Sequence, residues 1–144
     1  MRKIAILLSV IFLIVGNAYA ERGIDLQSKS DNYSQKIALV IGNSTYKSSP
    51  LKNPQNDAKD MTAQLRELGF KVISLTNATQ RQMRKSIRNF GNQLKKGGVG
   101  LFFFAGHGMQ VNGKNYLIPI GADIQEEDEV QDYAVDAGSV LRKM

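Results

Sequence analysis

The sequence contains no cysteine and no tryptophan, and it has only one histidine among its 144 residues. Without cysteine, a disulfide framework and a thiolate zinc site are both excluded. A single histidine also excludes a histidine-rich metal site, because Zn²⁺ normally takes three or four nitrogen, sulfur or oxygen ligands. A catalytic pair of cysteine and histidine therefore cannot be completed within these residues.

The N-terminus combines the features of a secretory leader. Arg2 and Lys3 precede an apolar run at 4–15, and an Ala-Tyr-Ala sequence ends at Ala20. This order predicts a signal peptide over 1–20, with cleavage after the last alanine and export to a bacterial periplasm or secretion. The apolar run is shorter than the roughly 20 residues that span a bilayer. An uncleaved membrane anchor is the alternative interpretation.

The net charge is positive but unevenly distributed. The formal charge is +6 at pH 7, yet the segment 123–136 holds seven acidic residues and no basic one. Basic residues are densest at 81–96, and such a face attracts nucleic acid. Aromatic residues do not interleave with the basic ones, so we interpret this segment as a solvated helix surface and expect no nucleic-acid partner.

The middle of the chain alternates between strand and helix patterns. Residues 21–35 are polar and aperiodic, as in a linker. Three apolar runs are typical of buried strands, at 36–41, 70–75 and 99–105. Between them, apolar residues recur at helical spacing over 58–68 and 83–94. Alternation with short loops predicts a parallel α/β sheet.

Both helices carry start signals. Asn53 precedes a proline, in the pattern of an N-cap followed by proline in the first turn, and Asn56 is an alternative cap. Thr79 and Gln82 have the spacing of a capping box. Farther along, Asn112-Gly113 predicts a hairpin turn.

Two glycine-containing segments lie beyond the carboxyl ends of predicted strands, where open parallel sheets bind ligands. They are Gly42-Asn43 and Gly106-His107-Gly108, and the second holds the only histidine. Glycine on both sides lets the backbone turn sharply and approach a substrate closely. An imidazole at such an edge can act as a general acid or base, because histidine side chains ordinarily titrate near neutral pH. A structural histidine is the alternative.

The segment 101–108, with the sequence LFFFAGHG, resembles the histidine motif of caspase-like cysteine peptidases, which include caspases, metacaspases and bacterial relatives. Further segments follow in the order of that family, at 36–43, 51–58, 65–70 and 115–119. The resemblance covers about residues 36–144. It implies an α/β fold of the caspase-hemoglobinase type: a three-layer sandwich, C-terminally incomplete, whose mostly parallel sheet is flanked by helices.

The resemblance assigns roles to three residues. His107 matches the catalytic histidine, which assists a cysteine thiolate and protonates the leaving amine. The backbone N–H of Gly108 matches a donor of the oxyanion hole. Asp57 matches a carboxylate that helps to line the pocket for the residue before the cut in metacaspases, which would favour Lys or Arg there. Stabilisation of a helix N-terminus is the alternative role for Asp57.

The sequence departs from the family pattern at the nucleophile. In the caspase pattern a cysteine at the end of the next strand lies roughly 50 residues after the histidine. Only 37 residues follow His107, and the last of them, 137–144, resemble the start of a helix. We therefore expect that strand and its cysteine beyond Met144, and we expect the chain alone to be inactive. A non-catalytic pseudopeptidase that binds protein partners is the rival hypothesis, and a module that binds anionic surfaces is a weaker one.

The expected partners are protein or peptide substrates, and no cofactor is required. The acidic run Glu126–Glu129 could hold Ca²⁺, which favours several carboxylate oxygens, and some metacaspases need calcium. The ligand spacing of a known calcium loop is missing, which favours a solvated acidic loop.

Overall fold

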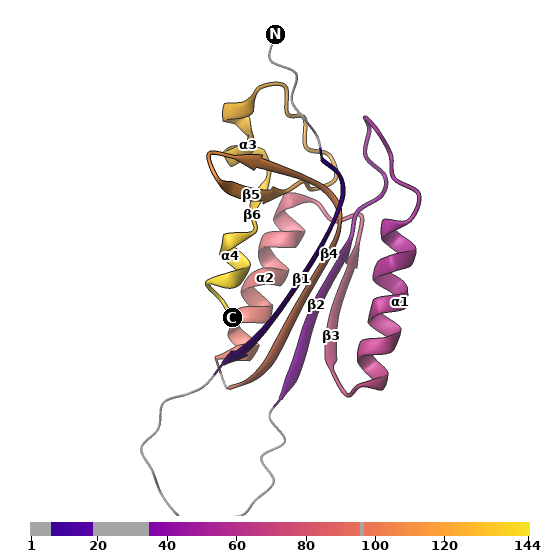
Figure 1. Cartoon of the computed structure of the whole chain (residues 1–144), viewed down its shortest axis with the longest axis vertical. Coiled ribbons are helices and arrows are strands. Elements are labelled where there is room, and N and C mark those ends of the chain that lie inside the picture. The colour runs from indigo at the N-terminus through magenta and orange to yellow at the C-terminus, as the bar shows by residue number, and fades with distance from the viewer. Residues whose placement is uncertain (1–6, 19–34, 96) are drawn as a thin grey trace, which may run out of the picture.

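A computed structural model describes residues 7–18, 35–95 and 97–144 (Figure 1). The predicted cleavage site at Ala20 and all but the last residue of the predicted linker lie outside these ranges. No helix in the described part of the chain is both long and apolar enough to cross a membrane.

The centre of the fold is a six-stranded mixed sheet with the order β3-β2-β4-β5-β6, in which β1 also pairs with β4. The strands are β1 (Leu7–Ala18), β2 (Lys36–Gly42), β3 (Lys71–Thr76), β4 (Gly98–Val111), β5 (Lys114–Leu117) and β6 (Val135–Asp136). The helices are α1 (Pro54–Glu67), α2 (Gln80–Leu94), α3 (Val130–Tyr133) and α4 (Gly138–Leu141), with a 3₁₀ turn, η1, at Glu127–Glu129.

The helices make two outer layers over this sheet, as the family resemblance implies. Figure 1 shows α1 on one side and α2 with α4 on the other. Alternate residues of β2 divide accordingly, because side chains of a strand point to opposite faces. Ile37, Leu39 and Ile41 pack in the core with α2, whereas Ala38 and Val40 pack with α1. The apolar runs are thus strands buried on both faces.

The expectation of a mostly parallel sheet needs correction. β2 is parallel to β3 and to β4, but the pairs β1–β4, β4–β5 and β5–β6 are antiparallel. For the β4–β5 pair the reason is the predicted hairpin, which the structure confirms: Asn112 and Gly113 both have positive φ, 49° and 75°. This turn returns the chain alongside β4. β4 is also longer than the predicted 99–105, because it exchanges β2 for β5 as its partner and continues to Val111.

The predicted leader forms part of this sheet. Residues Leu7–Ala18 make β1, which runs antiparallel to β4 from the pair Leu7–Gly108 to the pair Ala18–Gly98. Strand pairing does not test whether the chain is cleaved, so the signal peptide stays a prediction. β1 and β2 both pair with the first half of β4 and therefore lie on its opposite edges.

The two long helices begin differently. The predicted capping box of α2 is confirmed, with Thr79 and Gln82 exchanging side-chain and backbone hydrogen bonds. For α1 the predicted N-cap position of Asn53 and the proline after it are confirmed, but the side chain of Asn53 makes no capping bond. The backbone N–H of Gln55 instead donates to the hydroxyl of Ser44, at 3.2 Å. The cap of α1 comes from the loop after β2.

Candidate active site

His107 lies inside β4, at the point where the strand changes partners. The pairing with β2 ends at Ala105, and the pairing with β5 begins at Gly108. The carbonyl oxygens of Ala105 and His107 accept hydrogen bonds from Asn43 and Ile118, respectively. Residues two apart in a strand point their carbonyls to the same edge, so β5 continues along the edge that β2 leaves. The sequence predicts this histidine beyond the carboxyl end of the strand 99–105. The structure places it just past the carboxyl end of β2, within β4 rather than in a loop.

The imidazole of His107 is held by one of its two nitrogens. Only 4% of the residue is exposed, and Nε2 lies 2.7 Å from the carbonyl oxygen of Ser49. Because a carbonyl oxygen can only accept, Nε2 must carry the proton of this bond. Nδ1 is buried and has no hydrogen-bond partner in the described part of the chain. In the neutral ring Nδ1 therefore carries the lone pair, which is the form that a general base needs.

The loop that supplies this carbonyl is tied to the sheet. Asn77 accepts hydrogen bonds through its side-chain oxygen from the backbone N–H groups of Ser44 and Thr45, at 2.9 and 3.1 Å. Ser49 has a positive φ of 57° although it is not glycine. Such a conformation costs energy and persists where the surroundings impose it. Here it accompanies a carbonyl that is directed at the imidazole.

Asn43, singled out by its place after β2, is fully buried and has a structural role. Its side-chain oxygen accepts from the backbone N–H of Ala78 at 2.8 Å, and its amide lies 3.3 Å from the carbonyl oxygen of Ile118. One side chain thus joins the end of β2 to the start of α2 and to the end of β5. Satisfying every polar atom in this way is what makes a buried amide tolerable.

Tyr46 is the functional candidate that the sequence analysis missed. It is 8% exposed, and its ring centroid lies 4.3 Å from that of His107. Its hydroxyl donates to the carbonyl oxygen of Ile118 and accepts from the backbone N–H of His107. Burial raises the pKa of Tyr46 to about 12, partly offset by hydrogen bonds to His107 and Asn43. The available signal was an aromatic residue in an otherwise polar loop.

The amide of Gly108 points away from β5. Gly108 is opposite Leu117, and the 2.9 Å bond from Ile118 N–H to His107 C=O flanks this pair. In an antiparallel ladder, the pair next to a hydrogen-bonded pair is a non-hydrogen-bonded pair. The N–H and C=O of each residue in such a pair point away from the partner strand. The N–H of Gly108 is thus directed to the opposite edge of β4, where Leu7 of β1 is its partner.

Asp57 lies in the first turn of α1 and is half-buried. Its backbone N–H donates to Asn53, at 2.9 Å. Within the described ranges, its carboxylate takes part in no hydrogen bond or ion pair, and the side chains and backbone groups bonded to His107 come from other residues. The position suits stabilisation of the helix N-terminus. Because α1 directly follows the loop that holds the imidazole, the position also leaves the pocket role open.

The acidic run gives the calcium interpretation no support. No group of three or more His, Cys, Asp or Glu side chains could hold a metal ion among the residues that the structure describes. The carboxylate of Glu129 instead accepts from the backbone N–H groups of Gln125 and Glu126, at 2.7 and 3.1 Å. On α2, Arg84, Lys85 and neighbouring basic side chains are exposed, as expected of a solvated face.

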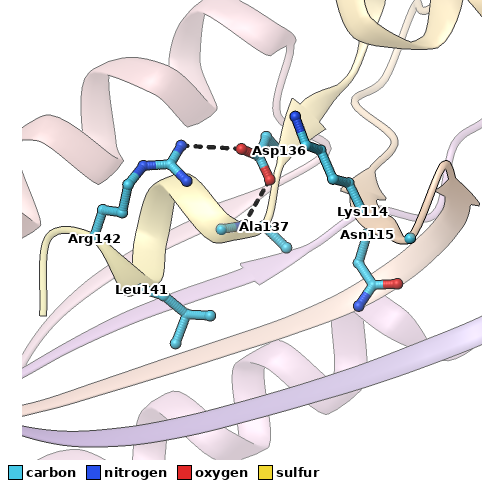
Figure 2. A pocket seen from close by; sticks show the side chains of 8 residues that line it. Lys114, Asn115, Asp136, Ala137, Leu141 and Arg142 are labelled. Atoms are coloured by element: carbon cyan, nitrogen blue, oxygen red, sulfur yellow. Dashed lines mark hydrogen bonds and ion pairs between the residues drawn. The ribbon is translucent and has the colours of Figure 1, made fainter.

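A cleft of about 530 Å³ lies away from this site, between the β4–β5 hairpin and α4 (Figure 2). Its polar wall is an ion pair in which Arg142 lies 3.0 Å from Asp136. Burial acts to raise the pKa of Asp136, but hydrogen bonds from Arg142 and the Gly138 backbone outweigh it and lower the pKa. None of the residues that contact His107 lines the cleft.

The sequence model of the caspase domain, Peptidase C14, matches residues 35–135, which is more than two thirds of the chain. The chain belongs to the caspase-domain family. The match contains β2, β4 and the loop after β2, which together form the site. The caspase-like α/β fold inferred from the LFFFAGHG segment is therefore confirmed.

Two curated relatives are similar to this caspase-domain chain. Mucosa-associated lymphoid tissue lymphoma translocation protein 1 of Homo sapiens is 42% identical over 88 residues, which are 60% of the chain and 11% of that protein. The homolog from Mus musculus is 41% identical over 88 residues, with the same shares. The chain thus spans about a tenth of the length of the curated relatives it matches.

Proposed function

We propose that this chain supplies the histidine half of a cysteine-type endopeptidase, with the nucleophile provided by polypeptide outside the 144 residues. The observation that carries the proposal is the state of the imidazole. Nε2 of His107 is bound to the Ser49 carbonyl, and Nδ1 is buried without a partner among the described residues. A base held in one tautomer with an available lone pair suits proton exchange with a thiol.

The chemistry would be acyl transfer. Nδ1 of His107 takes the thiol proton, and the thiolate attacks the carbonyl carbon of the scissile bond. The N–H of Gly108 donates to the oxyanion of the tetrahedral intermediate. When the carbon–nitrogen bond breaks, His107 returns the proton to the leaving amine and a thioester remains. Water, deprotonated by the same imidazole, then hydrolyses the thioester and regenerates the thiol.

We also propose that the protein is exported and loses residues 1–20. The supporting observation, beyond the leader pattern, is that Leu7 lies opposite Gly108 on the edge of β4. Removal of β1 would clear this edge and the amide that the oxyanion needs. N-terminal sequencing of the periplasmic protein tests this proposal, because a mature chain should begin at Glu21.

Substrate preference is proposed to depend on Asp57. A carboxylate in the first turn of α1, next to the loop that holds His107, would favour Lys or Arg before the cut through charge complementarity. In the active protein, replacing Asp57 with asparagine should remove a preference for basic over neutral peptides. An unchanged preference would reject this assignment and leave Asp57 as a helix-stabilising residue.

The first experiment is to read the gene past codon 144. We expect an apolar strand that ends in cysteine within roughly 10–30 codons, from the spacing between histidine and cysteine in the family. The encoded protein should cleave fluorogenic peptides, and His107→Ala should reduce kcat by at least about a hundredfold, as loss of a general base does. Lys114→Ala, at the distant cleft, is the control and should leave the rate unchanged.

Two results would reject the peptidase. One is a following strand that ends without cysteine, and the other is cleavage that persists in His107→Ala. The absence of cysteine from the 144 residues favours one rival, a caspase-like module that binds proteins without cutting them. That rival predicts a stable partner and no cleavage, so co-purification would replace the peptide assay.

A further inference from the structure

The hydrogen-bond ladder between β4 and β5 is interrupted at His107 by a side-chain hydroxyl that belongs to neither strand. His107 and Ile118 face one another just before the regular pairs begin at Gly108. A regular hydrogen-bonded pair would exchange two direct bonds. One is present, from Ile118 N–H to His107 C=O at 2.9 Å. In place of the other, His107 N–H donates to the Tyr46 hydroxyl at 3.0 Å, and that hydroxyl donates to Ile118 C=O at 2.9 Å.

The hydroxyl is chemically suited to this position. A phenol has one proton to donate and lone pairs to accept, so a single atom satisfies both the N–H and the C=O that the strands leave unpaired. Tyr46 comes from the loop after β2, and β5 continues along the edge of β4 that β2 leaves. Its side chain therefore closes the junction between two partners of β4 at the residue that carries the candidate base.

The surroundings make space for this insertion. A Cβ atom added to Gly106 would lie 2.6 Å from the Tyr46 hydroxyl and 2.7 Å from the Phe104 ring. The sequence analysis gives Gly106 the role of allowing close approach to a substrate. The structure adds a second reason for glycine, which is that any larger residue would displace the hydroxyl from the ladder.

The same loop holds the imidazole as well as the backbone. The ring of Tyr46 lies against that of His107 at an interplanar angle of 49°, and Ser49, three residues later, accepts from Nε2. We propose that Tyr46 is a positioning residue: its bridge between β4 and β5 holds His107 so that Nε2 meets the Ser49 carbonyl and Nδ1 remains available. The proposal deepens the proposed function and rests on it for its catalytic meaning.

The chain permits a direct test because it has one histidine, so only one imidazole contributes ring signals in nitrogen NMR. In the 144-residue chain, we expect the neutral ring to show the nitrogen shifts of a protonated Nε2 and a bare Nδ1. Tyr46→Phe keeps the ring and removes the bridge. It should mix the two tautomers and speed amide hydrogen exchange of His107 about tenfold, the factor for one net hydrogen bond. Tyr116→Phe, in the same buried cluster, is the matched control and should do neither.

Unchanged tautomer and exchange in folded Tyr46→Phe would overturn the proposal. If that variant does not fold, the wild-type chain decides: the hydroxyl proton of Tyr46 should exchange slowly and show a nuclear Overhauser effect to the His107 amide, and absence of that signal overturns it. In the longer gene product, Tyr46→Phe should lower kcat about tenfold with little change in KM. A rise in KM with kcat unchanged would contradict a positioning role. A longer product without peptidase activity rejects the proposed function but leaves the NMR result standing.

Discussion

The helices α1 and α2 are similar in length and pack on opposite faces of one sheet, yet their starts depend on different parts of the chain. The start of α2 is local, because Thr79 and Gln82 cap each other within four residues. The start of α1 depends on Ser44, eleven residues before the N–H that it caps. Ser44 belongs to the loop that also carries Tyr46 and Ser49.

This difference separates scaffold from site. The capping bonds of α2 run between Thr79 and Gln82, so a change confined to this cap leaves the hydrogen bonds that Asn77 and Ala78 make to the site loop in place. A change at the start of α1 passes into the loop that holds His107, because the same few residues serve both. Asp57 lies in that first turn, so the candidate base and the candidate specificity residue depend on one local geometry.

The largest expected effect comes from the packing of each helix on a glycine of the sheet. A Cβ at Gly42 would overlap the carbonyl oxygen of Pro54 and approach the Cβ of Ala58 to 2.6 Å, and backbone cannot rotate away. At Gly100 the nearest atom is a terminal methyl of Leu94, 2.7 Å away, on a flexible side chain. In urea denaturation we expect Gly42→Ala to cost about 3 kcal/mol of unfolding free energy, and Gly100→Ala about 1 kcal/mol. Equal losses would contradict the rigid coupling of α1.

The next effect is a dependence of stability on alkaline pH, which we expect from Tyr46 in the site loop. The pKa of Tyr46 is raised from 10.0 to about 12, so its contribution to stability is intact below pH 10 and is lost as pH rises toward 12. Two pKa units correspond to about 3 kcal/mol of unfolding free energy. Between pH 10 and pH 12 the unfolding free energy should therefore fall by about 3 kcal/mol less in Tyr46→Phe than in the wild type or in Tyr116→Phe. Equal alkaline slopes in all three proteins would show that Tyr46 ionises freely in the fold.

The elements that the sequence predicts well are those whose causes lie within a few residues. Thr79 caps α2 through Gln82, Asn112 and Gly113 make their own turn, and the apolar runs are strands covered on both faces. His107 was identified from a short motif, and the caspase-domain match contains it. These features need no knowledge of distant contacts.

The site loop could not be predicted in the same way. The bonds from His107 to Tyr46 and Ser49 span 61 and 58 residues of sequence, and no local pattern specifies them. Asn53 has the residue type and the following proline that favour an N-cap, yet its side chain makes no capping bond. The competing acceptor, the hydroxyl of Ser44, reaches the helix only after β2 and α1 have packed. Long-range packing therefore decided both the cap of α1 and the environment of the base.

The smallest expected effect comes from removing one capping hydroxyl from each helix, which compares the starts of α1 and α2 directly. Ser44→Ala and Thr79→Ala each remove one capping hydroxyl, and each should cost about 1 kcal/mol of unfolding free energy. Only Ser44→Ala should also move the ring-nitrogen signals of His107, because Ser44 lies in the loop that fixes the imidazole. A matched pair with equal stability loss excludes general loosening as the cause of any shift. If Thr79→Ala moves those signals equally, the start of α2 is coupled to the base as tightly as that of α1, and the separation of scaffold from site fails.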